Sequence, residues 1–561
     1  MAPTQHIFKN IRVYWLAFVV YWGIILFGYD TGVAGGVVSA PFFLQQFGLL
    51  NPDGTTNKQR NADVSSNVVS VLQAGAFFGA LGSAPISAKI GRRLTLQGFT
   101  LIFLVGAILT TVATGSHGLS EIYGGRVILG FGIGGISAVS PAFVSECSPK
   151  EVRGRITGLF QIFVAIGVMM SYWVNYGISV HVKPGPKLWQ IPFGVQLIPA
   201  GIMMLGLLTV KVSLVLHTLG GTGINISLLQ ESPRWLASVG RTEQAIANLA
   251  YLRKEPENSE AVIHEMAEIE AQIQEEREAR QGLGLREAFL GKGNLIRFVI
   301  AFVIFFLQQW SGQNSVNYYA PQIFASIGYT ARRNGLLATG VYGVVKVVAT
   351  SLFVFFGVEW LGRKASLFIS AMGMGTCFYI IGAILKTHPP PATDANTVVA
   401  NPPAASKGMA AMLYFYVCFY SMGWGPLPWY GVLRGHIPRR ARGTTEWPSP
   451  AHLSGSGVGF SSWPISHTSD TLPADFTLSK TTPQMVLNLG YKIFLMFATI
   501  NIAGMGVFAL LIPETKGRSL EDMDIIFGAV AQEKRDADIA KQEQGLMPFY
   551  CFLLRFILTT R

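Results

Sequence analysis

Long apolar stretches alternate along this chain with short polar or charged turns, and most of the stretches exceed twenty residues. A helix needs about 20 mostly apolar residues to cross a bilayer. The pattern therefore predicts membrane-spanning helices near 13–36, 66–88, 94–114, 119–145, 154–177 and 190–210, and then near 295–326, 333–358, 365–386, 408–430 and 485–512.

The predicted helices fall into a group of six and a group of five. A charged, helix-favouring block, 241–286, separates the groups and is expected to be a cytoplasmic linker, whereas the Pro-rich stretch 389–403 is expected to be an outward loop. Between 431 and 484 the chain is rich in Pro, Ser and His and has no apolar run long enough to span. Two groups of six helices would put both termini in the cytoplasm. The second group has only five predicted helices, so one helix is missing from the pattern.

Basic turns recur at matching places in the two groups. Gly-Arg-Arg at 91–93 corresponds to Gly-Arg-Lys at 362–364, and Glu-Ser-Pro-Arg at 231–234 and Pro-Glu-Thr-Lys-Gly-Arg at 513–518 end the two groups. Lys and Arg concentrate in cytoplasmic turns of membrane proteins. The repeat thus indicates a duplicated helical unit, which is the common plan of secondary transporters.

Composition supports a membrane protein and argues against other classes. Half of the 561 residues are hydrophobic and only 13% are charged. The net charge of +12 comes mainly from residues in the turns, so no nucleic-acid partner is expected. No metal-ligand spacing or nucleophile–base set is present, so we expect neither a cofactor nor an enzyme. We expect the first apolar run to remain in the protein as a signal anchor.

The motifs together resemble the sugar porter branch of the major facilitator superfamily, and the resemblance covers nearly the whole chain. It implies an all-α integral membrane protein with two six-helix halves, in the plasma membrane, with both termini cytoplasmic. Two further segments resemble quinate permeases of filamentous fungi. Besides the basic turns, the motifs are 125–130, Glu146 with 153–155, 231–236, 308–314 and 425–429; the two further segments are 171–177 and 343–350.

Three segments depart from the family pattern. Residues 212–230 intervene before the Glu-Ser-Pro-Arg motif, and we expect them to be a retained intron read in frame, with a genuine extra segment as the alternative. Residues 431–478 are expected to be translated out of frame, because 443–451 can be back-translated so that a two-base shift reads His-Tyr-Gly-Met-Ala-Ile-Ala-Ser, like the start of the family's eleventh helix. The tail is the third departure. The expected division is 1–211, N-terminal half; 212–230, insert; 231–290, linker with short helices; 291–430, helices seven to ten; 431–478, out of frame and irregular; 479–524, helix twelve and its motif; and 525–561, cytoplasmic tail.

Asp30 and Arg126 are ionisable residues inside predicted spanning helices. Such residues are costly in a membrane and usually face a partner or a cavity. A structural ion pair is one interpretation. The resemblance implies the other, because proton-coupled sugar porters carry this Asp and this Arg, and protonation of Asp30 would release Arg126.

Four amide side chains, Gln161, Gln308, Gln309 and Asn314, lie on the predicted fifth and seventh helices. Amides offer donors and acceptors, as vicinal hydroxyl groups require. Hydrogen bonding between helices is the alternative role. The resemblance implies that these residues bind substrate and that Trp429 stacks on its ring. Trp424 is a weaker candidate for stacking, because packing alone accounts for it.

Lys346 lies in the middle of an apolar stretch, where many hexose carriers have Asn. A lysine inside the membrane needs an anion. Quinate offers a carboxylate together with ring hydroxyls. The alternatives are pairing with a protein group or snorkelling to the interface.

Charged residues of the repeated turns are expected to gate the cytoplasmic side, through pairs that break when the two halves rock. They are Arg92, Arg93, Glu146, Arg153, Glu231, Arg234, Arg363, Lys364 and Glu514.

The sequence therefore predicts a proton-coupled carrier for quinate, with a monosaccharide as the second candidate substrate. A nutrient sensor on the same fold is disfavoured by the short tail after Asp524. The third possibility is a mis-spliced product that transports nothing because it lacks the eleventh helix.

Overall fold

The computed structural model describes residues 10–51, 56–113, 118–208, 231–280, 294–329, 331–357, 361–390, 402–428 and 462–512. Within them, nine helical segments are long and apolar enough to cross a membrane by length and composition. The predictions for 212–230 and for the tail 525–561 lie outside the described residues. The all-helical fold is confirmed.

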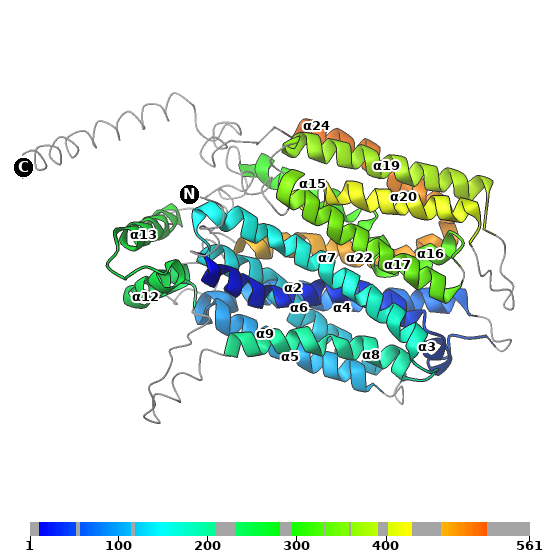
Figure 1. Cartoon of the computed structure of the whole chain (residues 1–561), viewed down its shortest axis with the longest axis horizontal. Coiled ribbons are helices and arrows are strands. Elements are labelled where there is room, and N and C mark those ends of the chain that lie inside the picture. The colour runs from blue at the N-terminus through cyan, green and yellow to red at the C-terminus, as the bar shows by residue number, and fades with distance from the viewer. Residues whose placement is uncertain are drawn as a thin grey trace, which may run out of the picture.

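The N-terminal half contains the six predicted spans, and its helices run lengthwise side by side (Figure 1). The sixth span is divided into two consecutive helices, α8 and α9. The helices are α2 (Ile11–Val38), the short α3 (Pro41–Gln46), α4 (Lys58–Ile90), α5 (Arg92–Val112), α6 (Ser120–Cys147), α7 (Lys150–His181), α8 (Lys187–Val195) and α9 (Leu197–Leu208).

Glycines allow the backbones of α4 and α6 to touch. A Cβ added at Gly79 would lie 2.0 Å from the Phe131 carbonyl oxygen, and one added at Gly130 would lie 2.2 Å from that of Leu72. Inside lipid no hydrophobic force drives helices together, so their association depends on close packing of this kind. This half is therefore held together by main-chain contact along its length.

The linker forms α11 (Pro233–Ser238), α12 (Thr242–Arg253) and α13 (Glu260–Arg280) at one end of the bundle, near the N-terminus (Figure 1). We call this the linker end, and the other the opposite end. The Trp235 indole donates to the Ala88 carbonyl (2.8 Å), and the Arg253 guanidinium donates to that of Cys147 (3.1 Å). The linker is thus bonded to α4 and α6 of the N-terminal half.

The C-terminal half begins with a broken span. The predicted helix 295–326 is interrupted at 310–312, where Gly312 has a φ of 91°. The helices are α15 (Asn294–Gln309), α16 (Gln313–Ser326), α17 (Arg332–Leu352) continued by the π-helix η1 (Phe353–Gly357), α19 (Arg363–Thr387), α20 (Ala404–Ser421), α22 (Ser462–Leu489), and a last span made of α23 (Lys492–Thr499), η4 (Ile500–Gly506) and α24 (Val507–Leu511).

The expected absence of an eleventh helix is wrong, because α22 occupies residues 462–489 and packs against α4, α15 and α16. The expectation of irregular structure over 431–478 is therefore wrong for 462–478, and 429–461 lie outside the described residues. The start predicted at 485 for the last span is also wrong. An apolar-run criterion missed α22 because this helix buries polar groups such as Thr482, whose hydroxyl bonds to that of Ser315 on α16.

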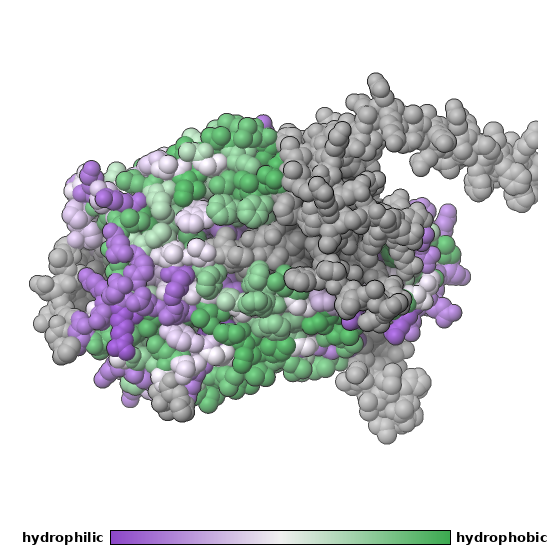
Figure 2. Space-filling model, turned by 180° about the vertical axis from the view of Figure 1, so that it is seen from behind, coloured by the Kyte–Doolittle hydropathy of each residue, from purple (hydrophilic) through white to green (hydrophobic). Residues whose placement is uncertain are grey.

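The duplication predicted from the basic turns has a structural counterpart. Gly91 and Gly362 have φ values of 95° and 83°, and each forms the N-cap of the helix that follows, α5 and α19. Seen from behind, apolar residues cover much of the flank of the bundle, and hydrophilic residues gather toward its ends (Figure 2). This is the surface expected of a protein surrounded by lipid.

Candidate functional site

The break between α15 and α16 carries the amide side chains predicted from the sequence. Gln308 and Gln309 end α15, and Asn314 lies in the first turn of α16. The Gln308 side chain donates to the Trp424 carbonyl (2.7 Å), in the turn after α20. Interrupted helices with exposed backbone groups are where transporters build binding sites.

Gln309 and Asn314 form a continuous hydrogen-bonded row with a carboxylate that the sequence reasoning missed. The Asn314 amide donates to Gln309 Oε1 and also to Asp475 Oδ1 (3.0 Å). The Tyr318 hydroxyl donates to Asp475 Oδ2 (2.8 Å). Asp475 is 6% exposed and lies on α22. The sequence did hold a signal for it: Asp475 and Ser479 are four residues apart, the spacing that puts two polar side chains on one face of a helix.

Lys346 lies on α17 and is 3% exposed. Its Nζ donates to Asn317 Oδ1 (3.2 Å), which also accepts from Gln313 Nε2 (2.8 Å). Gln313 donates in addition to the Tyr342 hydroxyl (2.9 Å). Lys346 is thus linked through Asn317 to Gln313, and both of these amides lie on α16, the helix that also carries Asn314 and Tyr318.

Asp30 and Arg126 form the predicted pair, with Arg126 Nη1 3.0 Å from Asp30 Oδ1 and side-chain exposures of 1% and 0%. Arg126 Nε also donates to the Val68 carbonyl (3.3 Å). Within the described residues, Asp30 Oδ2 and Arg126 Nη2 have no hydrogen-bond partner. One carboxylate oxygen is therefore available to take a proton.

The two halves meet at this site. Gln73 of α4 donates to the Tyr318 hydroxyl, and the Tyr172 hydroxyl of α7 donates to the Asn317 carbonyl (2.8 Å). Gln161 lies buried on α7 and makes no hydrogen bond to the amide row in the described part of the chain. The Trp424 indole is buried and donates to the Leu367 carbonyl (2.9 Å), so it packs within the protein. Trp429 lies outside the described residues.

At the linker end, Arg92 pairs with Glu146 (3.0 Å), and Glu146 accepts from the Ser232 hydroxyl (2.5 Å). The Glu231 carboxylate accepts from the backbone N–H groups of Arg92 (2.9 Å) and Arg93 (3.1 Å). It thus caps the N-terminus of α5, where a negative charge is favoured. Burial raises the pKa of Glu231, against the opposite effect of these hydrogen bonds.

Three of the other expected gating residues lie at the starts of helices. Arg234 lies in α11, and Arg363 and Lys364 begin α19. The Arg153 side chain and Glu514 lie outside the described residues. The structure brings Arg92, Glu146 and Glu231 together within the N-terminal half and its linker.

At the opposite end, polar contacts join the two halves. Gln484 of α22 donates to Asp63 Oδ1 (2.7 Å) and accepts from Gln59 (3.1 Å), both on α4. Lys480 donates to the Asn67 side chain one turn further in. These contacts hold α4 and α22 together at that end.

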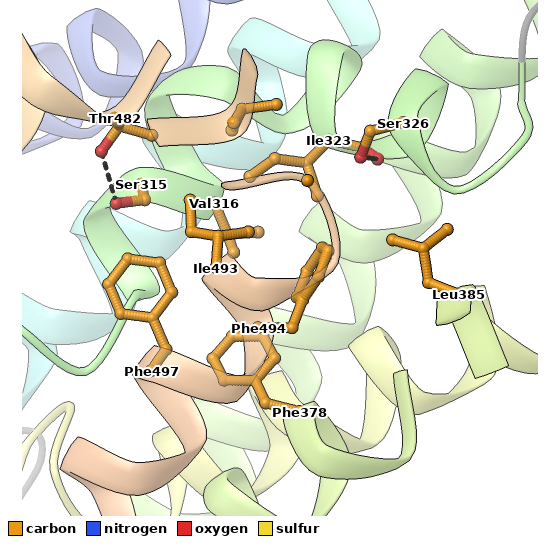
Figure 3. A pocket seen from close by; sticks show the side chains of 12 residues that line it. Ser315, Val316, Ile323, Ser326, Phe378, Leu385, Thr482, Ile493, Phe494 and Phe497 are labelled. Carbon is orange, nitrogen blue, oxygen red and sulfur yellow. Dashed lines mark hydrogen bonds between the residues drawn. The ribbon is translucent and has the colours of Figure 1, made fainter. Parts of the chain in front are cut away.

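An apolar pocket lies beside the amide row, inside the C-terminal half (Figure 3). Phe378, Phe494 and Phe497 line it, and its Ser315 and Thr482 hydroxyls bond to each other (2.8 Å). A polyol needs hydrogen-bonding side chains, and the row at Asn314 has several of these whereas the pocket is lined mainly by apolar side chains. The row between the halves is therefore the candidate functional site.

Two helical bundles with buried amides and a lysine at their junction, and a buried ion pair inside the N-terminal bundle, are the architecture of a membrane transporter of the major facilitator fold. The model of the family "Sugar (and other) transporter" matches residues 16–218, 222–443 and 471–527. The chain belongs to this family, and its activity is membrane transport of the sugar-porter type.

Known proteins resemble the chain over most of its length. It is 34% identical to a probable quinate permease of Aspergillus niger (94% of this chain, 89% of the relative) and 34% identical to the quinate permease of Emericella nidulans (94% and 90%). Among solved structures, the proton:xylose symporter XylE bound to 6-bromo-6-deoxy-D-glucose matches with a TM-score of 0.69 at 23% identity (92% and 100%). The inward-open xylose transporter XylE from E. coli matches with a TM-score of 0.66 at 22% identity (92% and 99%).

Proposed function

We propose that this protein takes up quinate together with protons across the plasma membrane, by alternating access and with both termini in the cytoplasm. The observation that carries the proposal is Lys346, a buried cation whose hydrogen-bond partner within the described residues is the neutral side chain of Asn317. A buried charge requires a counter-charge. The quinate carboxylate would supply it, and the ring hydroxyls would reach the amide row.

The names of the relatives support the choice of substrate. Proteins 34% identical to this chain over 94% of its length are named quinate permeases. These relatives and the site thus point to the same acidic polyol.

The Asp30–Arg126 pair supports proton coupling. The pair is fully buried, and Asp30 Oδ2 has no partner in the described part of the chain. A proton on Asp30 would cancel its attraction for Arg126, and the freed guanidinium would favour a different packing of the N-terminal half. Transport would then follow the proton gradient.

The contacts at the two ends of the bundle support alternating access. Gln484–Asp63 and Lys480–Asn67 join the halves at the opposite end and would have to break before the site opens there. The Arg92–Glu146–Ser232 network would keep the linker fixed to the N-terminal half during this motion.

A neutral monosaccharide is the second candidate substrate. The Asp475 carboxylate beside Asn314 favours it, because a negative charge in the site repels an anion. The gap in the family match covers residues 444–470, and it supports the proposal that this part of the segment 431–478 is out of frame. A mis-spliced, inactive product is the third candidate, through this foreign segment and not through loss of the eleventh helix, because α22 is present.

The test is uptake of labelled quinate into proteoliposomes with an imposed pH gradient. The proposal requires accumulation that an uncoupler abolishes. Asp30→Asn should lose accumulation and keep some exchange of internal for external quinate. Accumulation by Asp30→Asn would contradict the proton role, and transport of neutral sugars alone would contradict the choice of substrate.

A further inference from the structure

Asp475 is a buried acid on α22 that bonds to two side chains of α16. Its two oxygens accept hydrogen bonds from Asn314 (3.0 Å) and Tyr318 (2.8 Å). An ionised carboxylate has about four acceptor positions and no donor. Every group that faces Asp475 must therefore present a hydrogen atom to it.

This requirement fixes the orientation of the amide row. Asn314 must turn its NH₂ group toward Asp475, and the second hydrogen of that group points to Gln309. Gln309 must then present its oxygen to Asn314, and its own NH₂ group becomes available to a ligand. Asn314 keeps its carbonyl oxygen as an acceptor.

Asp475 also fixes the orientation of Gln73, which lies on α4 in the N-terminal half. The Tyr318 hydroxyl has one hydrogen and donates it to Asp475, so toward Gln73 it can act only as an acceptor. Gln73 must turn its NH₂ group to Tyr318, and its Oε1 atom is buried without a partner within the described residues. Gln73 therefore offers an acceptor from α4, whereas Gln309 offers a donor from α15.

Asp475 lies on the face of α22 that packs against α16. Ser479 and Thr482 follow it at helical spacing; the Tyr319 hydroxyl of α16 donates to the Ser479 backbone carbonyl (2.6 Å), and the Thr482 hydroxyl bonds to that of Ser315, also on α16 (2.8 Å). The family match also resumes at residue 471, before Asp475. These observations place Asp475 in the family's eleventh helix, so the out-of-frame segment ends before it.

We propose that Asp475 is a positioning residue that sets the donor–acceptor polarity of the substrate site. Its charge makes Gln309 a donor and Gln73 an acceptor, so the substrate must present an accepting oxygen to the first and a hydroxyl hydrogen to the second. The inference rests on the proposed function only in taking the amide row as the substrate site. It does not depend on whether the substrate is quinate or a neutral sugar.

The test compares Asp475→Asn with the natural full-length protein. An Asn side chain can donate or accept, so the row is no longer held in one orientation. The measured quantities are inhibition constants for exchange in proteoliposomes without a pH gradient. The probes are substrate analogues in which one ring hydroxyl at a time is replaced by fluorine, which only accepts, or by hydrogen, which does neither.

For the hydroxyl that receives the Gln309 hydrogen, the natural protein should bind the fluoro analogue about threefold to tenfold better than the deoxy analogue, since one hydrogen bond is at stake. In Asp475→Asn this ratio should fall to about one, and the parent substrate should bind about tenfold more weakly. Thr482→Val, on the same face of α22 but bonded to Ser315, should leave the ratio unchanged. An unchanged ratio in Asp475→Asn overturns the proposal.

Asp475→Glu keeps a group that only accepts, and it covers the case in which the Asn variant does not fold. It should retain the fluoro-to-deoxy preference even if overall affinity falls, and loss of the preference in a folded Asp475→Glu protein also overturns the proposal. If the protein exchanges a neutral sugar and no quinate, the fluoro and deoxy derivatives of that sugar are used. Failure of the quinate assignment is thus distinguished from failure of the role given to Asp475.

Discussion

Replacing Lys346 by Asn tests whether this cation selects an acidic ring. Lys346 is 3% exposed, and its hydrogen bond within the described residues goes to Asn317 at 3.2 Å. If the quinate carboxylate pairs with it, truncation leaves that carboxylate buried without a counter-charge. Truncating one partner of such a pair costs about 2–5 kcal/mol. At about 1.4 kcal/mol per factor of ten, quinate affinity should fall roughly 30-fold to 4,000-fold.

The assay is competition against labelled substrate, with quinate and a neutral sugar as competitors in the same membranes. Lys346→Asn should lose quinate affinity far more than affinity for the sugar, which has no carboxylate to leave unpaired. Lys480→Asn is a matched control, because Lys480 also bonds an asparagine, Asn67, but at the opposite end of the bundle. Equal losses for both competitors in Lys346→Asn would refute the reasoning and leave Lys346 as a structural residue.

Two further predictions concern packing and the gene. Gly79→Ala should lower the unfolding temperature of the purified protein, because its Cβ would lie 2.0 Å from the Phe131 carbonyl oxygen and overpacking costs about 1–3 kcal/mol. Gly98→Ala has no neighbour within 4 Å and should not lower it; equal melting of the two variants would contradict the packing argument. Sequenced mature transcript should lack codons for 212–230 and encode His-Tyr-Gly-Met-Ala-Ile-Ala-Ser within the foreign segment. Transcript that encodes 444–473 as printed would disprove the frame shift.

The sequence predicted those helices whose apolar runs are long enough to span. In α4 the prediction began at 66 although the helix begins at Lys58, because the first two turns are polar. The break at Gly312 was not predicted, since the apolar pattern continues on both sides of it. The helix α22 was missed for a related reason. Its polar side chains are stabilised by partners far away in sequence, which a local pattern does not contain.

The candidate site was predicted in part. The Asp30–Arg126 pair was expected from the sequence and is present. Gln309 and Asn314 were expected to bind substrate, and their hydrogen bond to each other was not predicted. Gln308 instead bonds the Trp424 carbonyl, because the turn after α20 comes close to α15. The role of Asp475 as a partner of Asn314 depends on how α16 and α22 pack together, and residue spacing within either helix does not determine that.

The docking of the linker on the N-terminal half has a consequence for biosynthesis. The linker bonds to α4 and α6, and all of these residues leave the ribosome before α15 is made. The first half can therefore complete its packing while the second is still being synthesised. Asp63, Asn67 and Gln73 on the polar side of α4 bond to residues of α16 and α22, which are synthesised later. These side chains are therefore unpaired when α4 first enters the membrane. Until α22 is synthesised, these polar side chains lack their partners on it, and a membrane chaperone could shield them from lipid.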